Sequence, residues 1–363
     1  MKMKLFAAAV AALAAGGAYA QSSVTLYGVV DAGIEFQNNQ PGGDHTVTRM
    51  TSGNQSGSRW GLRGVEDLGG GLKGVFVLES GFSVDDGKMG QDSRLFGRQA
   101  YVGVSSQWGQ LTLGRQQTPF YEFGLQFDPM AIASKYSITS QDAAFASRAD
   151  NSIKYVGTFG GLTANALYSF GSNTGGAASA FQGNAGEVPG SAKIGREYSL
   201  SLTYAGGPFA IGAVYDETNL GILATPDAKT RRASVAGSYA FGPAKAFAGY
   251  RWAKGYDVGG VIPGVIAGNK NSSNLYWLGL GYQMTPAFSL TGAAYYQDFR
   301  GSGADPWTFV ATADYALSKR TDAYLSMSYA KNKENSNLGV DGFGKTNASD
   351  NQFGAVVGIR HKF

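Results

Sequence analysis

Arginines that alternate with apolar residues carry the clearest chemical information in this sequence. Arg59 and Arg63 alternate with Trp60 and Leu62. In a β-strand this spacing places the two arginines on one face and the two apolar side chains on the other. Charged groups that line a water-filled space orient polar solutes and bias the passage of ions. The pattern therefore predicts a strand with one apolar face and one basic, aqueous face.

A second such position occurs in the run Arg-Gln-Ala-Tyr at 98–101. Gln99 and Tyr101 share one face of the expected strand, which leaves Arg98 on the other. An unpaired arginine that contacts lipid would cost about 2–4 kcal/mol at mid-membrane. If these strands cross a membrane, we expect the arginines at 59, 63 and 98 to face the interior.

The stretch 118–150 differs from the other polar stretches because it is rich in apolar side chains. A fully solvated loop would not expose so many of them, so we expect this stretch to pack against a wall. It also contains the carboxylates Glu122, Asp128 and Asp142. The apolar side chains are Phe120, Tyr121, Phe123, Phe127, Met130, Ile132, Tyr136, Ile138 and Phe145.

Other reactive chemistry is poorly supported. Cysteine is absent, which excludes disulfide frameworks, thiolate nucleophiles and Cys-ligated metal sites. Of the two histidines, His45 falls in an expected loop and His361 alternates onto an apolar face. The glycine-rich run at 69–74 superficially resembles a phosphate loop, but no helix follows and it fits a hairpin turn. We predict no cofactor, no metal site and no enzymatic activity.

The elements that position these residues are indicated by composition. Of 363 residues, 43% are hydrophobic and only 15% are charged, against about 25% charged in an ordinary soluble domain. The chain also contains 54 glycines, 21 phenylalanines and 20 tyrosines. Mean hydropathy is −0.15, and beyond the N-terminal leader no apolar run approaches the ~20 residues of a membrane-spanning helix. The composition favours β-structure and excludes a helical membrane protein.

The N-terminal segment has the pattern of a secretory signal peptide. Lys2 and Lys4 precede an apolar core, and the segment ends in the small-residue sequence Ala18-Tyr19-Ala20. We predict a cleaved signal peptide at 1–20 and a single domain at 21–363, because the apolar core is too short for an anchoring helix. Without the two leader lysines, 28 basic residues remain against 26 acidic ones. This balance of +2 predicts no nucleic-acid partner.

Period-two alternation recurs from residue 24 to the C-terminus, clearly at 307–317 and 352–363. Seven short turns separate long Gly/Asn/Ser-rich stretches near 37–48, 84–93, 118–150, 171–196, 217–229, 254–272, 298–306 and 332–350. Fifteen connections predict sixteen strands. Short turns on one side and long loops on the other are typical of an outer-membrane β-barrel with periplasmic turns and extracellular loops. The alternative is a soluble β-sandwich, but so many long strands with eight large loops would be unusual for one.

Several segments resemble the general porins of Gram-negative bacteria, of the type found in Neisseria, Bordetella, Burkholderia and Comamonas. The resemblance covers essentially the whole chain after the leader. The similar segments are SVTLYG at 23–28, SRWGLRGVEDLGGGLKGVFVLESGF at 58–82, RLFGRQAYVGVSS at 94–106, LTLGRQ at 111–116, DNSIKY at 150–155, LSKRTDAYLSMSYA at 317–330 and the terminal GIRHKF.

The resemblance implies a homotrimer and an all-β, sixteen-stranded antiparallel transmembrane barrel with an infolded third loop. It also implies that Arg59, Arg98 and Arg148 stand across the constriction from Glu122 or Asp128. Arg148 precedes the strand expected at Asn151, so a position within the loop stays open. Arg63 joins the basic set by its alternation alone.

The expected function is an outer-membrane channel for passive diffusion of small hydrophilic solutes and ions. The loop at 118–150 would constrict it, with a mild preference for anions. The chain is expected to form a homotrimer and to contact outer-membrane lipid, lipopolysaccharide and the solutes themselves. Alternatives are a solute-specific channel, which needs a row of aromatic side chains facing the lumen, and a surface adhesion or recognition protein that uses the long loops at 171–196 and 332–350.

Overall fold

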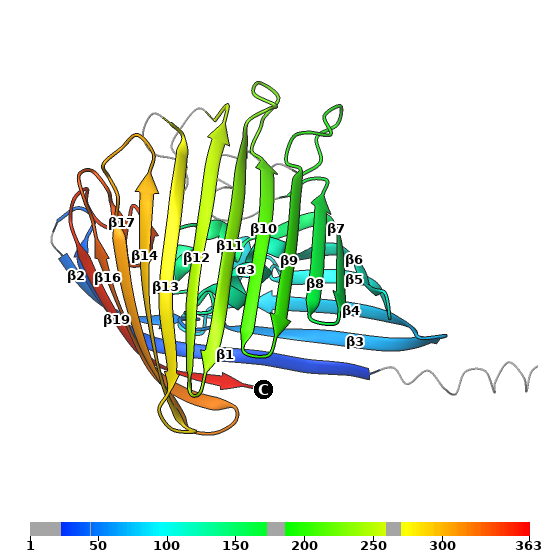
Figure 1. The fold of residues 1–363 in the computed structure, drawn as a ribbon, viewed down its shortest axis with the longest axis horizontal. Coiled ribbons are helices and arrows are strands. Elements are labelled where there is room, and N and C mark those ends of the chain that lie inside the picture. The colour runs from blue at the N-terminus through cyan, green and yellow to red at the C-terminus, as the bar shows by residue number, and fades with distance from the viewer. Residues whose placement is uncertain (1–22, 44, 173–185, 259–269) are drawn as a thin grey trace, which may run out of the picture.

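The computed structural model describes residues 23–43, 45–172, 186–258 and 270–363. Most of them form one antiparallel sheet that closes on itself (Figure 1). The predicted signal peptide at 1–20 lies outside the described residues, as do parts of the expected loops at 171–196 and 254–272.

The barrel wall consists of β1 (Ser23–Gln40), β2 (His45–Ser52), β3 (Arg59–Gly69), β4 (Leu72–Gly81), β5 (Gln99–Ser106), β6 (Gly109–Gln117), β7 (Arg148–Phe159), β8 (Leu162–Ser169), β9 (Glu197–Gly206), β10 (Phe209–Asn219), β11 (Lys229–Phe241), β12 (Ala244–Tyr256), β13 (Ser272–Gln283), β14 (Phe288–Phe299), β15 (Trp307–Ala316), β16 (Thr321–Lys331) and β19 (Gln352–Lys362). The connections contain α2 (Gly90–Ser93), α3 (Pro119–Phe127), the 3₁₀ turns η1 (Ile138–Ser140) and η2 (Ala143–Ala146), and the small hairpin β17 (Leu338–Gly339) with β18 (Gly342–Phe343).

The wall has sixteen strand positions. One edge of β1 pairs with β19, while the other pairs first with β3 and then with β2. Strands β2 and β3 therefore share one position, which is interrupted at 53–58. Closure extends to the last residue, because the Gly28 amide donates to the Phe363 carbonyl at 3.0 Å. The predicted sixteen-stranded barrel is confirmed. It leaves no open sheet edge, as hydrocarbon requires.

Two predicted loop boundaries are wrong. The connection expected at 37–48 is short, because β1 continues to Gln40 and β2 begins at His45. The strand expected near Asn151 begins at Arg148. In both places a strand continues through mostly polar residues whose composition suggested a loop. Arg148 therefore belongs to the wall.

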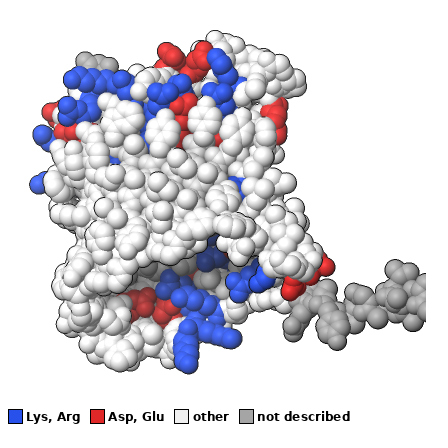
Figure 2. All heavy atoms as spheres, turned by 45° about the vertical axis from the view of Figure 1, so that its right-hand side comes forward, with Lys and Arg blue, Asp and Glu red and all other residues white. Residues whose placement is uncertain are grey.

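The outer surface is an apolar belt. Outward side chains stay highly exposed in the isolated chain, for example Val24 at 64% and Leu278 at 65%. The residues that alternate with the outward ones point inward. Asp31 of β1 and Thr308 of β15, for example, are fully buried. Figure 2 shows the belt as a broad zone almost without charged side chains, with Lys, Arg, Asp and Glu gathered at both rims. No helix in the described ranges is long and apolar enough to cross a membrane.

The connection between β6 and β7 folds into the barrel. We call residues 118–147 the infolded loop; it contains α3, η1 and η2. Figure 1 shows α3 behind β10 and β11, and it contacts strands β8 to β12. Its apolar side chains pack against inward-facing wall residues, including Leu275, Trp277 and Tyr295. The expectation that this stretch packs against a wall is confirmed.

Candidate functional site

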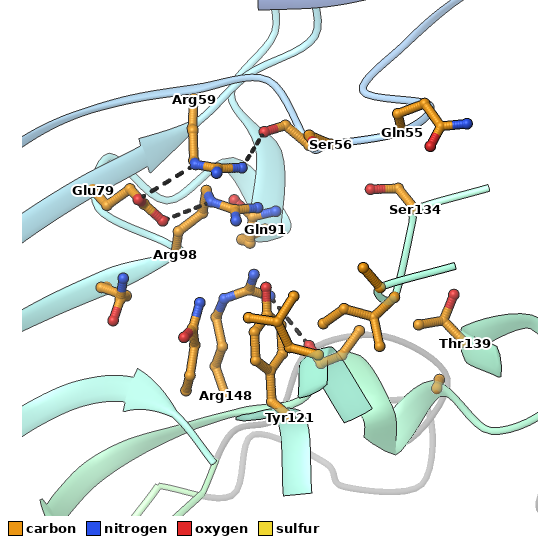
Figure 3. Close-up of a pocket in the computed structure, with 18 of the residues that line it drawn as sticks. Gln55, Ser56, Arg59, Glu79, Gln91, Arg98, Tyr121, Ser134, Thr139 and Arg148 are labelled. Carbon is orange, nitrogen blue, oxygen red and sulfur yellow. Dashed lines mark hydrogen bonds and ion pairs between the residues drawn. The ribbon is translucent and has the colours of Figure 1, made fainter. Parts of the chain in front are cut away.

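An open cavity of about 760 Å³ remains on the side of the barrel that the infolded loop does not fill. Strands β1, β3, β4 and β5 form one wall of this cavity, and the infolded loop forms another (Figure 3). Four arginines line it together with four tyrosines. We call Arg59, Arg63, Arg98 and Arg148 the arginine cluster; the tyrosines are Tyr27, Tyr101, Tyr121 and Tyr136.

Glu79 is the carboxylate at the centre of the arginine cluster. Its Oε1 lies 2.8 Å from Arg98 Nε and its Oε2 lies 3.6 Å from Arg59 Nε. Tyr27 donates a hydrogen bond to the same Oε2 at 3.0 Å. Glu79 of β4 stands opposite Gly61 of β3, and the absence of a side chain at Gly61 leaves room for these contacts. Glu79 thus partly neutralises Arg59 and Arg98.

Sequence reasoning missed Glu79. The available indication was a lone carboxylate directly after the apolar strand sequence Val75 to Leu78. Such a group must face the interior and find a cation there, because an unpaired buried charge is costly. Its partners are Arg59 on β3 and Arg98 just before β5. The register of the strands brings these two arginines close to Glu79.

Arg148 differs from Arg59 and Arg98 because none of the carboxylates described lies within ion-pair distance of it. Its Nη1 donates to the Ala146 carbonyl at 3.2 Å, and its guanidinium carbon lies 5.2 Å from the centre of the Tyr121 ring. The buried Nε has no protein partner. Arg148 therefore contributes a positive charge to the cavity that no nearby acid cancels, as does Arg63, which lies over the Tyr27 ring at 5.5 Å.

Arg98 lines the cavity as expected, but the expected facing of the β5 residues beside it is wrong. Val102 and Val104 of β5 point outward, with exposures of 61% and 41%, so Ala100 points outward and Tyr101 lines the cavity. Arg98 also lines the cavity, although alternation would set it apart from Tyr101. The reason is that Arg98 precedes β5, where regular alternation no longer applies.

Neither Glu122 nor Asp128 lines the cavity with the arginine cluster. Glu122 forms an ion pair with Lys154 and accepts a hydrogen bond from Asn165, both on the wall beside α3. Asp128 is buried and accepts hydrogen bonds from the Tyr295 hydroxyl at 2.5 Å and the Ile132 amide at 2.8 Å. Burial raises the pKa of Asp128 to about 6. Both carboxylates anchor the infolded loop, because α3 turns toward the wall to bury its aromatic side chains.

Asp142 provides another anchor at the far end of the loop. Its Oδ2 lies 2.9 Å from Arg232 Nε and 3.4 Å from Arg251 Nε, and all three side chains are at least nine-tenths buried. Trp277 adds a hydrogen bond from its indole nitrogen to the Phe127 carbonyl at 3.0 Å. These contacts hold the infolded loop at several points along its length.

We expect Asp142→Ala to loosen the infolded loop. Removing one partner of a buried ion pair typically costs about 3–5 kcal/mol, and the lower end applies because Arg232 also lies 3.8 Å from Asp216. The measurement is the rate of limited proteolysis within 118–147, with the current noise of single channels as a second readout. Asp86→Ala breaks only an exposed pair with Lys88 and serves as the control. Equal proteolysis of the two variants would contradict an anchoring role for Asp142.

A closed sixteen-stranded barrel with an apolar exterior and a charged, open interior defines a channel of the outer-membrane type. The chain belongs to the Gram-negative porin family, whose model matches residues 7–335. An outer membrane porin protein of Bordetella pertussis is 33% identical over 407 aligned residues, with 100% of each chain covered. Outer membrane porin protein 32 of Delftia acidovorans is 33% identical over 382 residues, again with full coverage of both.

The solved structures agree with this assignment. The anion-selective porin from Comamonas acidovorans matches with a TM-score of 0.78 and 27% identity, over 94% of this chain and 100% of that one. A trimer form of the Vibrio cholerae outer membrane protein OmpT matches with a TM-score of 0.62 at 16% identity, which shows the shared fold alone. The chain is therefore an outer-membrane porin channel. Its relatives are channels and not enzymes, and no cluster of potential metal ligands occurs in the described residues.

Proposed function

We propose that this porin is a passive diffusion channel for small hydrophilic solutes and ions, with a mild preference for anions. One lining carboxylate, Asp341, is already paired with Arg49 and Lys135. The observation that carries the proposal is the rest of the cavity beside the infolded loop, where four arginines lie near a single carboxylate, Glu79. Counting these five groups alone gives a local charge of +3. Facing charges of this kind orient polar solutes and favour ions of the opposite sign.

The expected preference is modest. One unit charge at 4 Å is worth about 1 kcal/mol in bulk water and about 4 at an effective dielectric of 20. The cavity is open to water, so the weaker value applies and each uncompensated arginine changes the ion ratio by about fivefold at most. Salt reduces the effect, because the Debye length is about 10 Å at 0.1 M and 3 Å at 1 M.

Planar-bilayer recording tests the proposal. In a KCl gradient we expect an ohmic pore whose reversal potential shifts toward chloride, with a shift that shrinks as ionic strength rises. A reversal potential on the potassium side would contradict the anion preference. Block by one solute at low concentration would instead favour the solute-specific alternative, and absence of conductance would contradict a channel.

Glu79→Gln is expected to strengthen the anion preference. The substitution removes the one carboxylate beside Arg59 and Arg98 while an amide of similar shape preserves the packing. The local charge rises from +3 to +4, so the chloride-to-potassium permeability ratio rises by up to about fivefold at low salt. Glu66→Gln, at an exposed position near a turn, removes one negative charge away from the cavity and serves as the control. An equal shift in the two variants would show that Glu79 does not act locally.

We also propose that residues 1–20 are cleaved on export and that the mature chain assembles as a homotrimer. The proposal for the leader is supported by its charged start, apolar core and small-residue end. The trimer is supported by the motifs shared with general porins. The intact mass of the purified protein tests the first, with cleavage expected before Gln21, and light scattering in detergent tests the second.

A further inference from the structure

The lipid-facing surface of the barrel contains an apolar groove across β9, β10, β11 and β12, with a volume of about 340 Å³. Small side chains at Ala213 and Ala233 form its floor. Larger apolar side chains flank them; these are Leu200, Leu202, Tyr215, Val235 and Tyr250. The three aliphatic members of this flanking set are 50–53% exposed in the isolated chain. The groove is therefore a recess in the belt that contacts lipid, outside the pore.

Basic side chains lie on the same outer face, between the groove and the loop ends of these strands. Lys229 and Arg231 belong to β11, and Lys254 is the register partner of Arg231 on β12. The Arg231 guanidinium carbon and the Lys254 ammonium nitrogen lie 4.9 and 5.1 Å from the centre of the same ring, that of Tyr256. Two cations thus share one aromatic ring, although like charges repel.

One carboxylate opposes these three cations. Glu217 Oε2 lies 2.6 Å from Arg231 Nε, and its Oε1 lies 3.6 Å from Lys229 Nζ. In the described residues Lys254 has no ion pair, and the nearest acidic residue along the chain is Asp257. Counting Lys229, Arg231, Lys254 and Glu217 alone, the patch has a charge of +2 at the rim of the membrane. This excess is complementary to an anion.

The spacing of the basic patch and the groove matches the dimensions of a lipid. Arg231 and Val235 are four residues apart on β11, which corresponds to about 13 Å at about 3.3 Å per residue. The cations therefore lie at headgroup level while the groove extends into the acyl-chain region. Arginine binds phosphate through two parallel hydrogen bonds, and lysine binds it as a point charge.

We propose that Lys229, Arg231 and Lys254 bind a phosphate of an outer-leaflet lipid, one acyl chain of which occupies the groove over Ala213 and Ala233. The long loops of a porin lie on the outer side of the membrane, and this patch lies at the loop ends of its strands. The phosphorylated lipid of that leaflet is lipopolysaccharide, so its lipid A part is the occupant. The site is separate from the pore and does not depend on ion selectivity.

Native mass spectrometry of the delipidated, detergent-solubilised porin tests the proposal, with bisphosphorylated lipid A as the probe. We expect Arg231→Gln with Lys254→Gln to weaken binding by about 25-fold, because each cation near a membrane surface contributes about fivefold. The matched control is Lys319→Gln with Lys331→Gln, which removes two exposed lysines away from the groove.

Two further arms separate the headgroup from the acyl chain. Dephosphorylated lipid A is expected to bind the wild-type porin as weakly as bisphosphorylated lipid A binds the double variant. Ala213→Leu with Ala233→Leu fills the groove without changing any charge and is expected to weaken lipid A binding as well. The four substitutions in the patch and the groove lie on the outer face of the barrel, and circular dichroism verifies each barrel. Unchanged binding in either variant, or an equal loss in the control, overturns the proposal.

Discussion

Replacing residues 122–140 by a short Gly-Ser linker is expected to raise the single-channel conductance roughly twofold or more, because a sixteen-stranded barrel without an internal segment leaves a wide aqueous channel. The removed segment contains most of α3 and all of η1 and forms one wall of the cavity. The barrel itself should persist, since the ladder hydrogen bonds of the wall strands do not involve the loop. Conductance in planar bilayers is the measurement.

The deletion also exposes Trp277 and Tyr295 to water on the inner wall, which provides an independent check. Tryptophan emission should shift to longer wavelength in the shortened protein. Shortening the connection between β10 and β11 within 222–227 is the control, because those residues do not line the cavity. A shortened protein that folds and conducts like the wild type would show that the infolded loop does not limit the pore.

Replacing Arg63 and Arg148 by glutamate is expected to reverse the ion preference of the channel. Neither of the two arginines forms an ion pair with a described carboxylate, so the pair Arg98–Glu79 stays intact. The charge of the five groups around the cavity changes from +3 to −1. Each unit is worth about fivefold in ion ratio at most, so the reversal potential at low salt should change sign.

The same number of charges is reversed far from the cavity by Lys319→Glu with Arg320→Glu, at an exposed turn. This control should shift the reversal potential only slightly, and the shift should vanish in 1 M salt, where the Debye length is about 3 Å. Arg63→Gln with Arg148→Gln should reduce the anion preference without reversing it. Equal reversal potentials for wild type and the glutamate variant at low salt would place both arginines outside the ion path.

The wall of this porin is readable from sequence because its determinants are local. Alternation of apolar and polar residues, turn spacing and the need to pair every backbone group in hydrocarbon together require a closed sheet. The outward positions of Val24 and Leu278 and the inward positions of Asp31, Arg59 and Arg63 follow from that period of two. Two boundaries were wrong where a strand continues through polar residues, since polarity alone does not end a β-ladder.

The interior depends on contacts that no local pattern encodes. The aromatic side chains of the infolded loop indicate that it packs somewhere, but burial against Trp277 and Tyr295 decides the direction in which α3 points. That direction takes Glu122 and Asp128 to the wall and leaves Glu79, on a strand, as the carboxylate among the arginines. Residues far apart in the chain meet inside the barrel because apolar side chains pack across the lumen and buried charges must be paired there. The sequence by itself therefore determined the barrel and two of its inward arginines, while the tertiary structure alone decided which acid each cation meets.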